Sequence, residues 1–250
     1  MAVLLTLIRR ELAGYFLSLR GYVIMAGVQL MLGASLLMVV HSLNQRAFNL
    51  PLTEVFPQSE YFWMVLLLIA PIITMRTFAH EKFTGTFETL MTTPVQDFQV
   101  VLAKFVGAYI FYLIAFLPML TYPFILKHFA HQPMQLEWRA VLSLGGGVAL
   151  FGAFFISLGC FASSLTRSQI VAAVATFAIG TGHLILSYLS DLRPPEMKWW
   201  FLLYQHISLL EHMKDFASGI LDTRHIIFYL SLTGVFLFLT FQSIESRRWK

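Results

Sequence analysis

The sequence predicts an all-α integral membrane protein with six transmembrane helices. Two observations support this class. Of the 250 residues, 58% are hydrophobic and 12% are charged, whereas soluble domains are about 45–50% apolar and about 25% charged. Six windows are also almost free of charge, and most reach the roughly 20 residues that a spanning helix needs. We further expect an N-terminal interfacial helix, a cytoplasmic helix between the second and third spans, and a short extracytoplasmic helix before the sixth.

Residues 1–20 are expected to form the interfacial helix. Its apolar side chains recur at helical spacing, at Leu4, Ile8, Leu12, Tyr15, Phe16 and Leu19. Arg9, Arg10 and Glu11 interrupt the apolar character on the remaining surface. An amphipathic helix of this kind lies in the plane of the membrane interface. A cytoplasmic helix packed on the rest of the protein fits the same pattern.

The six spans are expected at residues of about 21–43, 57–79, 101–126, 139–163, 168–190 and 225–244, within one transmembrane domain, 1–250. The second charge-free window, Tyr61–Met75, is short. It reaches full length only if Arg76 extends its guanidinium group to the interface, as long basic side chains near a helix end do.

The distribution of basic residues predicts the orientation. An even number of spans puts both termini on one side. With the termini inside, ten of the 17 lysines and arginines fall inside and seven outside, and four of those seven belong to one long loop. Cytoplasmic segments carry the excess of Lys and Arg. We therefore expect both termini, and the segment between spans two and three, in the cytoplasm.

That polar segment, residues 80–94, shows helical order. Phe83, Phe87 and Leu90 fall at i, i+4 and i+7, so they share one face of a helix. Glu81 and Glu88 lie seven residues apart, on one polar face. An amphipathic helix tethered at both ends to membrane spans can transmit movement to or from a partner. The plainer interpretation is that the two glutamates form a solvated helix face.

Gly85 and Pro94 refine this expectation. Pro94 cannot continue a helix, which should therefore end near Thr93. Glycine inside a helix costs roughly 1 kcal/mol relative to alanine, so we interpret Gly85, within a helix over 81–92, as a sign of close backbone approach, either to a partner or to the neighbouring interfacial helix. Glu81 has a second possible role, in which it holds the N-terminal helix through Arg9 or Arg10.

The short helix before the sixth span is expected in the loop that contains Trp199 and Trp200, which suit an interfacial position. Its apolar stripe comprises Leu203, Ile207, Leu210, Met213 and Ala217. The helix lies on, or dips into, the outer leaflet; a helix docked on the bundle is the alternative.

Features of catalysis are weak in this sequence. It has no phosphate-binding loop motif and no HExxH motif, and one cysteine, Cys160, makes no multi-cysteine metal site. Ser163 or Ser164 with His183 could suggest an intramembrane serine protease, but the serines should lie near the cytoplasmic end of their span and His183 far from it. We expect no catalytic or metal site, no bound cofactor and no nucleic-acid partner.

The segment between spans two and three resembles the cytoplasmic loop of ABC-2 type transporter permeases. That family carries the pattern E-x-x-x-G-T-x-E-x-L-x-x-x-P, whose positions here are Glu81, Gly85, Thr86, Glu88, Leu90 and Pro94. Arg10-Glu11-Leu12 is similar to the family's N-terminal interfacial helix. The tail, from Leu209 through Thr233, is similar to the gliding-motility-type subgroup.

This resemblance implies the membrane permease subunit of an ABC exporter in the bacterial inner membrane. ATP and Mg would bind on separate cytoplasmic ABC ATPase subunits, and the six motif residues would form the ATPase-coupling element. A second permease copy or a paralogue would complete a dimer within the lipid bilayer. The alternative is an ATPase-linked membrane scaffold of an envelope or motility assembly, without a transported substrate. An intramembrane enzyme is a third, disfavoured hypothesis.

Overall fold

The computed structural model describes residues 2–45, 52–86, 96–129, 137–191 and 206–246. Its long helices are α2 (Leu19–Gln45), α4 (Glu60–Thr74), α7 (Asp97–Phe116), α9 (Trp138–Leu165), α10 (Gln169–Asp191) and α13 (Thr223–Glu245). The shorter ones are α1 (Ala2–Phe16), α3 (Leu52–Val55), η1 (Phe56–Gln58), α5 (Ala79–Thr84), η2 (Leu117–Thr121), α8 (Tyr122–Phe129) and α12 (Leu209–Ala217).

Six segments of the described chain are long and apolar enough to cross a membrane, which confirms the predicted number of spans. They are Leu19–His41, Glu60–Thr84, Asp97–His128, Trp138–Leu165, Gln169–Tyr188 and Thr223–Glu245. The second includes α5 as well as α4, and the third continues through η2 into α8. Proline explains the second of these interruptions, because Pro118 lies in η2 and lacks the donor that a regular α-helix needs there.

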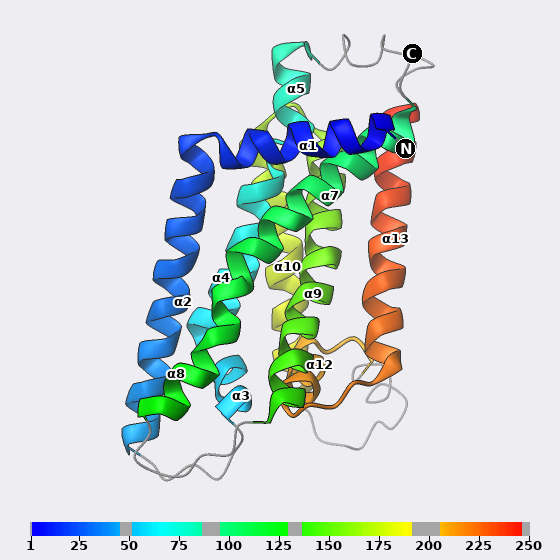
Figure 1. Ribbon diagram of the computed structural model, residues 1–250. Helices are drawn as coiled ribbons and strands as arrows, with labels where there is room; N and C mark the ends of the chain where they lie inside the picture. The colour runs from blue at the N-terminus through cyan, green and yellow to red at the C-terminus, as the bar shows by residue number, and fades with distance from the viewer. Residues whose placement is uncertain (1, 46–51, 87–95, 130–136, 192–205, 247–250) are drawn as a thin grey trace.

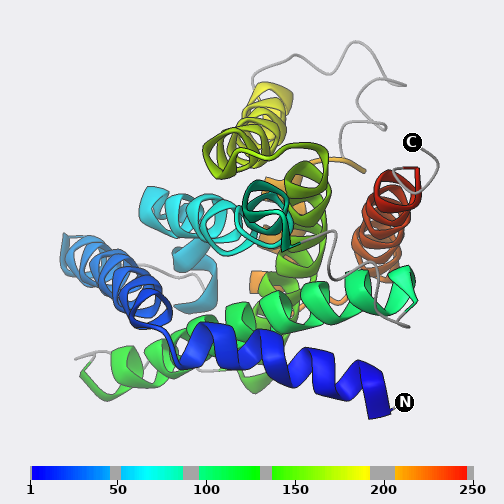
Figure 2. The same cartoon turned by 90° about the horizontal axis from the view of Figure 1, so that it is seen from above.

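The spans run side by side, and α1 lies across one end of them (Figure 1). We call this the α1 end of the bundle; α5 projects from it. The helices α3, α8 and α12 lie at the opposite end, which we call the α12 end. Viewed from above, α9 occupies the middle of the bundle, and α2, α10 and α13 lie around it (Figure 2).

Burial follows this arrangement. In the spans Glu60–Thr84 and Trp138–Leu165, 72% of the most apolar 18-residue stretch is buried, against 22% in the spans of α2 and α10 and 17% in the span of α13. The outer spans therefore expose large apolar side chains, including Leu30, Val174 and Phe238. Exposed apolar side chains on long apolar helices suit contact with lipid or with another apolar helix face, as expected of a multi-pass membrane protein.

Glycines allow the central helix to pack closely. Side chains from three different elements approach α9 at Gly145, Gly152 and Gly159, where an added Cβ would lie within 3 Å of Leu120, Tyr112 and Thr74 respectively. Small residues permit such close approach between membrane helices. The heptad spacing of these glycines therefore serves bundle packing.

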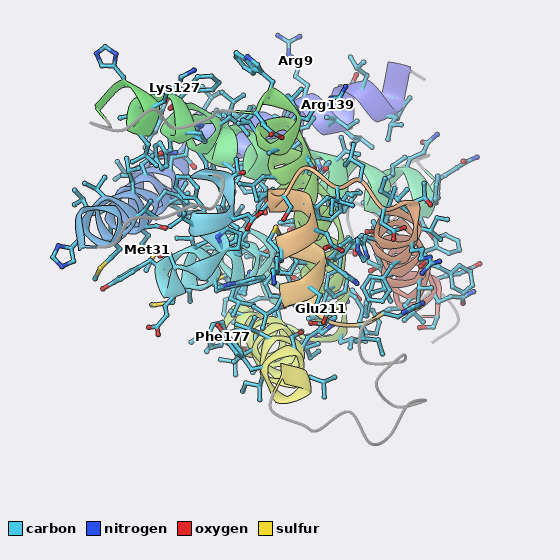
Figure 3. The ribbon with its side chains drawn as sticks, turned by 90° about the horizontal axis from the view of Figure 1, so that it is seen from below. Arg9, Met31, Lys127, Arg139, Phe177 and Glu211 are labelled. Atoms are coloured by element: carbon cyan, nitrogen blue, oxygen red, sulfur yellow. The ribbon has the colours of Figure 1, made fainter. Side chains whose placement is uncertain are left out.

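The helix before the last span, α12, docks on the bundle. Met213 and Phe216 are fully buried, and Phe216 lies over Gly147 of α9. Ser208 caps the helix by accepting a hydrogen bond from the Glu211 N–H. Figure 3, seen from the α12 end, shows α12 across the middle of that end, with Glu211 on it. These contacts favour the docked alternative, and its extracytoplasmic side stays a prediction.

The positive-inside orientation predicts labelling that differs between the two ends. A cysteine at Lys127, in α8, should react with a membrane-impermeant maleimide in intact cells, because the α12 end would face outward. A cysteine at Thr84, in α5, should react only after permeabilisation. Both positions are exposed, and the native Cys160 is fully buried, so background labelling should be low. The reverse pattern would contradict cytoplasmic termini.

Candidate functional site

The helical hydrogen bonding breaks between α4 and α5. The Met75 N–H still donates to the Pro71 carbonyl (2.9 Å), but the Thr77 N–H donates to Thr74 (3.0 Å) instead of to the Ile73 carbonyl. The Tyr15 hydroxyl of α1 donates to that Ile73 carbonyl, at 3.2 Å. A helix end needs such replacement partners, so the break is the point at which α1 contacts the second span.

Ser163 of α9 stabilises the same break from the other side. Its Oγ accepts hydrogen bonds from the backbone N–H groups of Phe78 (3.1 Å) and Ala79 (3.0 Å), and it donates to the Met75 carbonyl at 3.3 Å. Ser163 is fully buried. The first N–H groups of a helix have no partner within it, and here a distant span supplies one. The start of α5 is therefore fixed to the end of α9.

A second contact joins α5 to α9. The Lys82 ammonium group donates to the Ser164 carbonyl, and Lys82 is 7% exposed. The end of a helix carries partial negative charge on its free carbonyls, and Ser164 is in the last turn of α9. A buried lysine at this position is therefore compensated by the helix end that it contacts.

The most buried charge at the α1 end is Lys104 of α7, whose side chain is 3% exposed. Its Nζ lies 2.6 Å from Glu81 Oε1 of α5 and 3.3 Å from Glu11 Oε1 of α1. Glu11 also pairs with Arg10 at 3.1 Å. We call Lys104, Glu11 and Glu81 the Lys104 cluster; it connects α1, α5 and α7.

The Lys104 cluster corrects one sequence-based hypothesis. Glu81 does hold the N-terminal helix, but through Lys104 and Glu11 rather than through Arg9 or Arg10, both of which are exposed. The second oxygen of Glu81, Oε2, is buried and has no hydrogen-bond partner within the described residues. Glu81 therefore depends strongly on Lys104 for compensation of its charge.

The helix α1 reaches the Lys104 cluster because α7 has a glycine where the two cross. A Cβ on Gly107 would lie 2.8 Å from Glu11 Cβ. One turn further along α7, the Phe111 ring stacks on Tyr15 at 4.8 Å and contacts the edge of Phe16 at 5.4 Å. Burial raises the pKa of Tyr15, so its hydroxyl stays protonated and remains a donor to α4. Figure 2 shows α1 and α7 lying side by side.

The structure places Gly85 at the end of a helix, whereas the sequence pattern predicts it within one. It ends α5 with φ at 74°, in the left-handed region, so the helix that contains Glu81 stops there and the expected continuous helix over 81–92 does not form. An added Cβ at Gly85 would meet nothing within 4 Å. The backbone conformation therefore explains the glycine, and Gly85 makes no close approach to the N-terminal helix α1; an approach to a partner stays a prediction. Of the other motif residues, Thr86 is exposed, whereas Glu88, Leu90 and Pro94 lie outside the described residues.

The chain matches one protein-family model, described as ABC-2 family transporter protein, over residues 2–190. The chain belongs to this family. Comparison with curated proteins gives no match. The matched stretch of this ABC-2 transporter protein includes α1, α5 and the Lys104 cluster. The residues similar to the gliding-motility-type subgroup lie after it, so that subgroup stays a prediction.

The residues considered for catalysis serve packing in this ABC-2 transporter protein. Ser163 caps α5 at the α1 end, and the Ser164 hydroxyl bonds within its own helix, to the Phe161 carbonyl at 2.7 Å. His183 lies 2.8 Å from the Ile207 carbonyl and links α10 to the segment before α12. His183 is 14 residues into α10, about 21 Å along a helix that starts beside the end of α9. The structure therefore does not bring the serines and the histidine together.

Sequence reasoning missed Lys104 as a site residue, and it considered Ser163 only as a possible catalytic serine and not as the residue that caps α5. Lys104 had a usable signal, because it falls inside the predicted third span, and an ionisable residue within a span is a functional candidate. Ser163 had no such signal. A serine near the end of a span is common, and only the fold shows that it faces the break after Met75.

Replacing Lys104 with methionine should destabilise the ABC-2 transporter protein. The change keeps the side-chain length but leaves Glu81 and Glu11 without their shared cation. Leaving buried charged groups unpaired costs about 1–3 kcal/mol or more, so the melting temperature in detergent should fall by roughly 2–10 °C. Lys127→Met, at an exposed lysine of the α12 end, is the control and should change little. Equal melting temperatures for the two variants would contradict a structural role for the cluster.

Proposed function

We propose that the protein is the permease subunit of an ABC exporter, powered by ATP hydrolysis on separate ATPase subunits that carry ATP and Mg. Membership of the ABC-2 transporter family makes the chain a membrane component of such a transporter. The observation that carries the mechanistic part is the attachment of α5. It is fixed to α9 by Ser163 and to α1 and α7 by Lys104.

The exposed tip of α5 is suited to receive force. Phe83 is 74% exposed at this tip, and Thr84 and Thr86 join their hydroxyls across Gly85 at 2.9 Å. An exposed aromatic side chain flanked by polar groups is typical of a residue that anchors an interface. We assign this tip, with the motif residues that follow Gly85, to the contact with the ATPase. The α1 end would then lie in the cytoplasm.

Movement of α5 would pass to two groups of helices. One path runs through Ser163 and Ser164 to α9, the central span. The other runs through Glu81 and Lys104 to α7 and α1, and from Tyr15 back to α4. A side chain that is locked by packing and hydrogen bonds transmits displacement better than a flexible connection. The exposed apolar surfaces of the outer spans would meet lipid and a second permease copy or paralogue in the inner membrane.

The experiment that tests this function begins with purification of the tagged chain from its native membrane. A protein with a Walker A motif should copurify. Gly85→Leu should then preserve membrane insertion but reduce coupled ATP hydrolysis, because leucine in a left-handed conformation costs about 1–2 kcal/mol. If that penalty falls on the coupled arrangement, activity should fall roughly 5–30-fold. Gly85→Asn is the matched control, since asparagine tolerates this conformation.

Three results would count against the proposal. If no nucleotide-binding protein copurified with the tagged chain, the proposed ATPase partner would be ruled out. If coupled ATP hydrolysis were equal in the Gly85→Leu and Gly85→Asn variants, α5 would be only a passive connector. ATP hydrolysis that depends on α5 but responds to no candidate substrate would favour the membrane scaffold over the exporter.

A further inference from the structure

A cavity of about 490 Å³ opens beside the Lys104 cluster, between α1, α2, α4 and α5. Ligand sites in proteins typically measure about 300–1,000 Å³. Figure 2 shows α2 and α4 side by side at this corner, with α1 running into α2. The chain turns sharply there, and the Ser18 hydroxyl donates to the Tyr15 carbonyl at 3.2 Å. The cavity is therefore built at the α1 end of the bundle, where α1 turns into α2 and α4 leads into α5.

The charged side chains that line the cavity carry a net positive charge. Lys104 lines it, but Glu11 and Glu81 line it too and neutralise that lysine. Arg20 and Arg76 also line it, and neither makes an ion pair with any residue that the structure describes. A guanidinium group presents a fork of N–H donors that matches the oxygens of a phosphate. Two arginines without carboxylate partners thus face a space large enough for an anion.

The remaining lining of the cavity is largely apolar, and it continues onto the exposed outer surfaces of the neighbouring spans. Ile72, in the last turn of α4, lies four residues before Arg76 and is 40% exposed; Val23 follows Arg20 by nearly one turn of α2 and is 62% exposed. One turn of helix rises about 5.4 Å. On α2, and at the end of α4, the lining therefore changes within three or four residues from arginine to an exposed apolar side chain on the surface of a membrane span.

We infer that this cavity binds the phosphate-bearing head group of an anionic membrane lipid. Arg20 and Arg76 contact the phosphate, and the acyl chains follow Val23 and Ile72 along the groove between α2 and α4. Basic pockets between membrane helices on the cytoplasmic side hold anionic head groups in this way. Because Glu11 and Glu81 neutralise Lys104, Arg20 and Arg76 determine the selectivity for an anionic head group. Binding of this kind needs neither ATP nor a transported substrate, so it can be tested independently of the proposed exporter function.

The test uses the full chain in neutral detergent and fluorescently labelled phosphatidylglycerol, with fluorescence anisotropy as the readout. Phosphatidylglycerol should bind more tightly than labelled phosphatidylcholine, whose head group has no net charge. Arg76→Gln should raise the Kd for phosphatidylglycerol roughly tenfold or more, because charge-assisted hydrogen bonds are lost. Arg20→Gln should act in the same direction, and since Arg20 is exposed, that variant keeps the fold even if Arg76→Gln does not.

The matched control is Arg139→Gln, which removes the same charge from an exposed arginine at the α12 end (Figure 3). It should leave the Kd unchanged. Three results would overturn the inference. The first is equal affinity for phosphatidylglycerol and phosphatidylcholine, and the second is an equal loss of affinity for phosphatidylglycerol in Arg139→Gln and Arg20→Gln. The third is full displacement of the lipid by millimolar inorganic phosphate. The last result would make the cavity a small-anion site that does not select an amphiphile.

Discussion

The arrangement of helices at the α1 end of this protein depends on the buried cation of Lys104. Lys104 is 3% exposed, and two carboxylates from different elements compensate its charge. An unpaired charge in such a place is strongly unfavourable, so α1, α5 and α7 are stable in this arrangement only together. The glycine crossing at Gly107 and the stacking on Phe111 then determine how closely α1 approaches.

The cluster also explains why a short helix such as α5 can have a defined position. Six residues are too few for a helix to be stable on its own in water. Here Ser163 satisfies its first N–H groups, Lys82 contacts the end of α9, and Gly85 ends it in a left-handed turn. The helix is held at its start and along one side, while its tip stays exposed. That combination of a fixed start and an exposed tip supports the proposal that α5 contacts the ATPase.

Much of the fold could be predicted from the sequence. The absence of charge and the length of the apolar windows locate spans because the bilayer leaves few alternatives to an apolar helix. The site is different, because its contacts are not local: Glu11 and Lys104 are 93 residues apart, and Glu81 and Lys104 are 23 apart. No periodic pattern pairs such residues. Gly85 shows a further limit, since the apolar spacing continues across it although the backbone turns there.

The central claim is that α5 and α1 move as one unit through Lys104. The most direct test is pulsed electron paramagnetic resonance on the assembled transporter, with spin labels on two exposed residues, Phe83 of α5 and Arg9 of α1. A second pair, Phe83 of α5 and the exposed Ile227 near the start of α13, joins the α1 end to the α12 end of the bundle through a helix other than those to which Ser163 and Lys104 fix α5. The account predicts that ATP binding leaves the Phe83–Arg9 distance unchanged and alters the Phe83–Ile227 distance. A change in the Phe83–Arg9 distance on ATP binding would show that α5 moves without α1, and would contradict the claim.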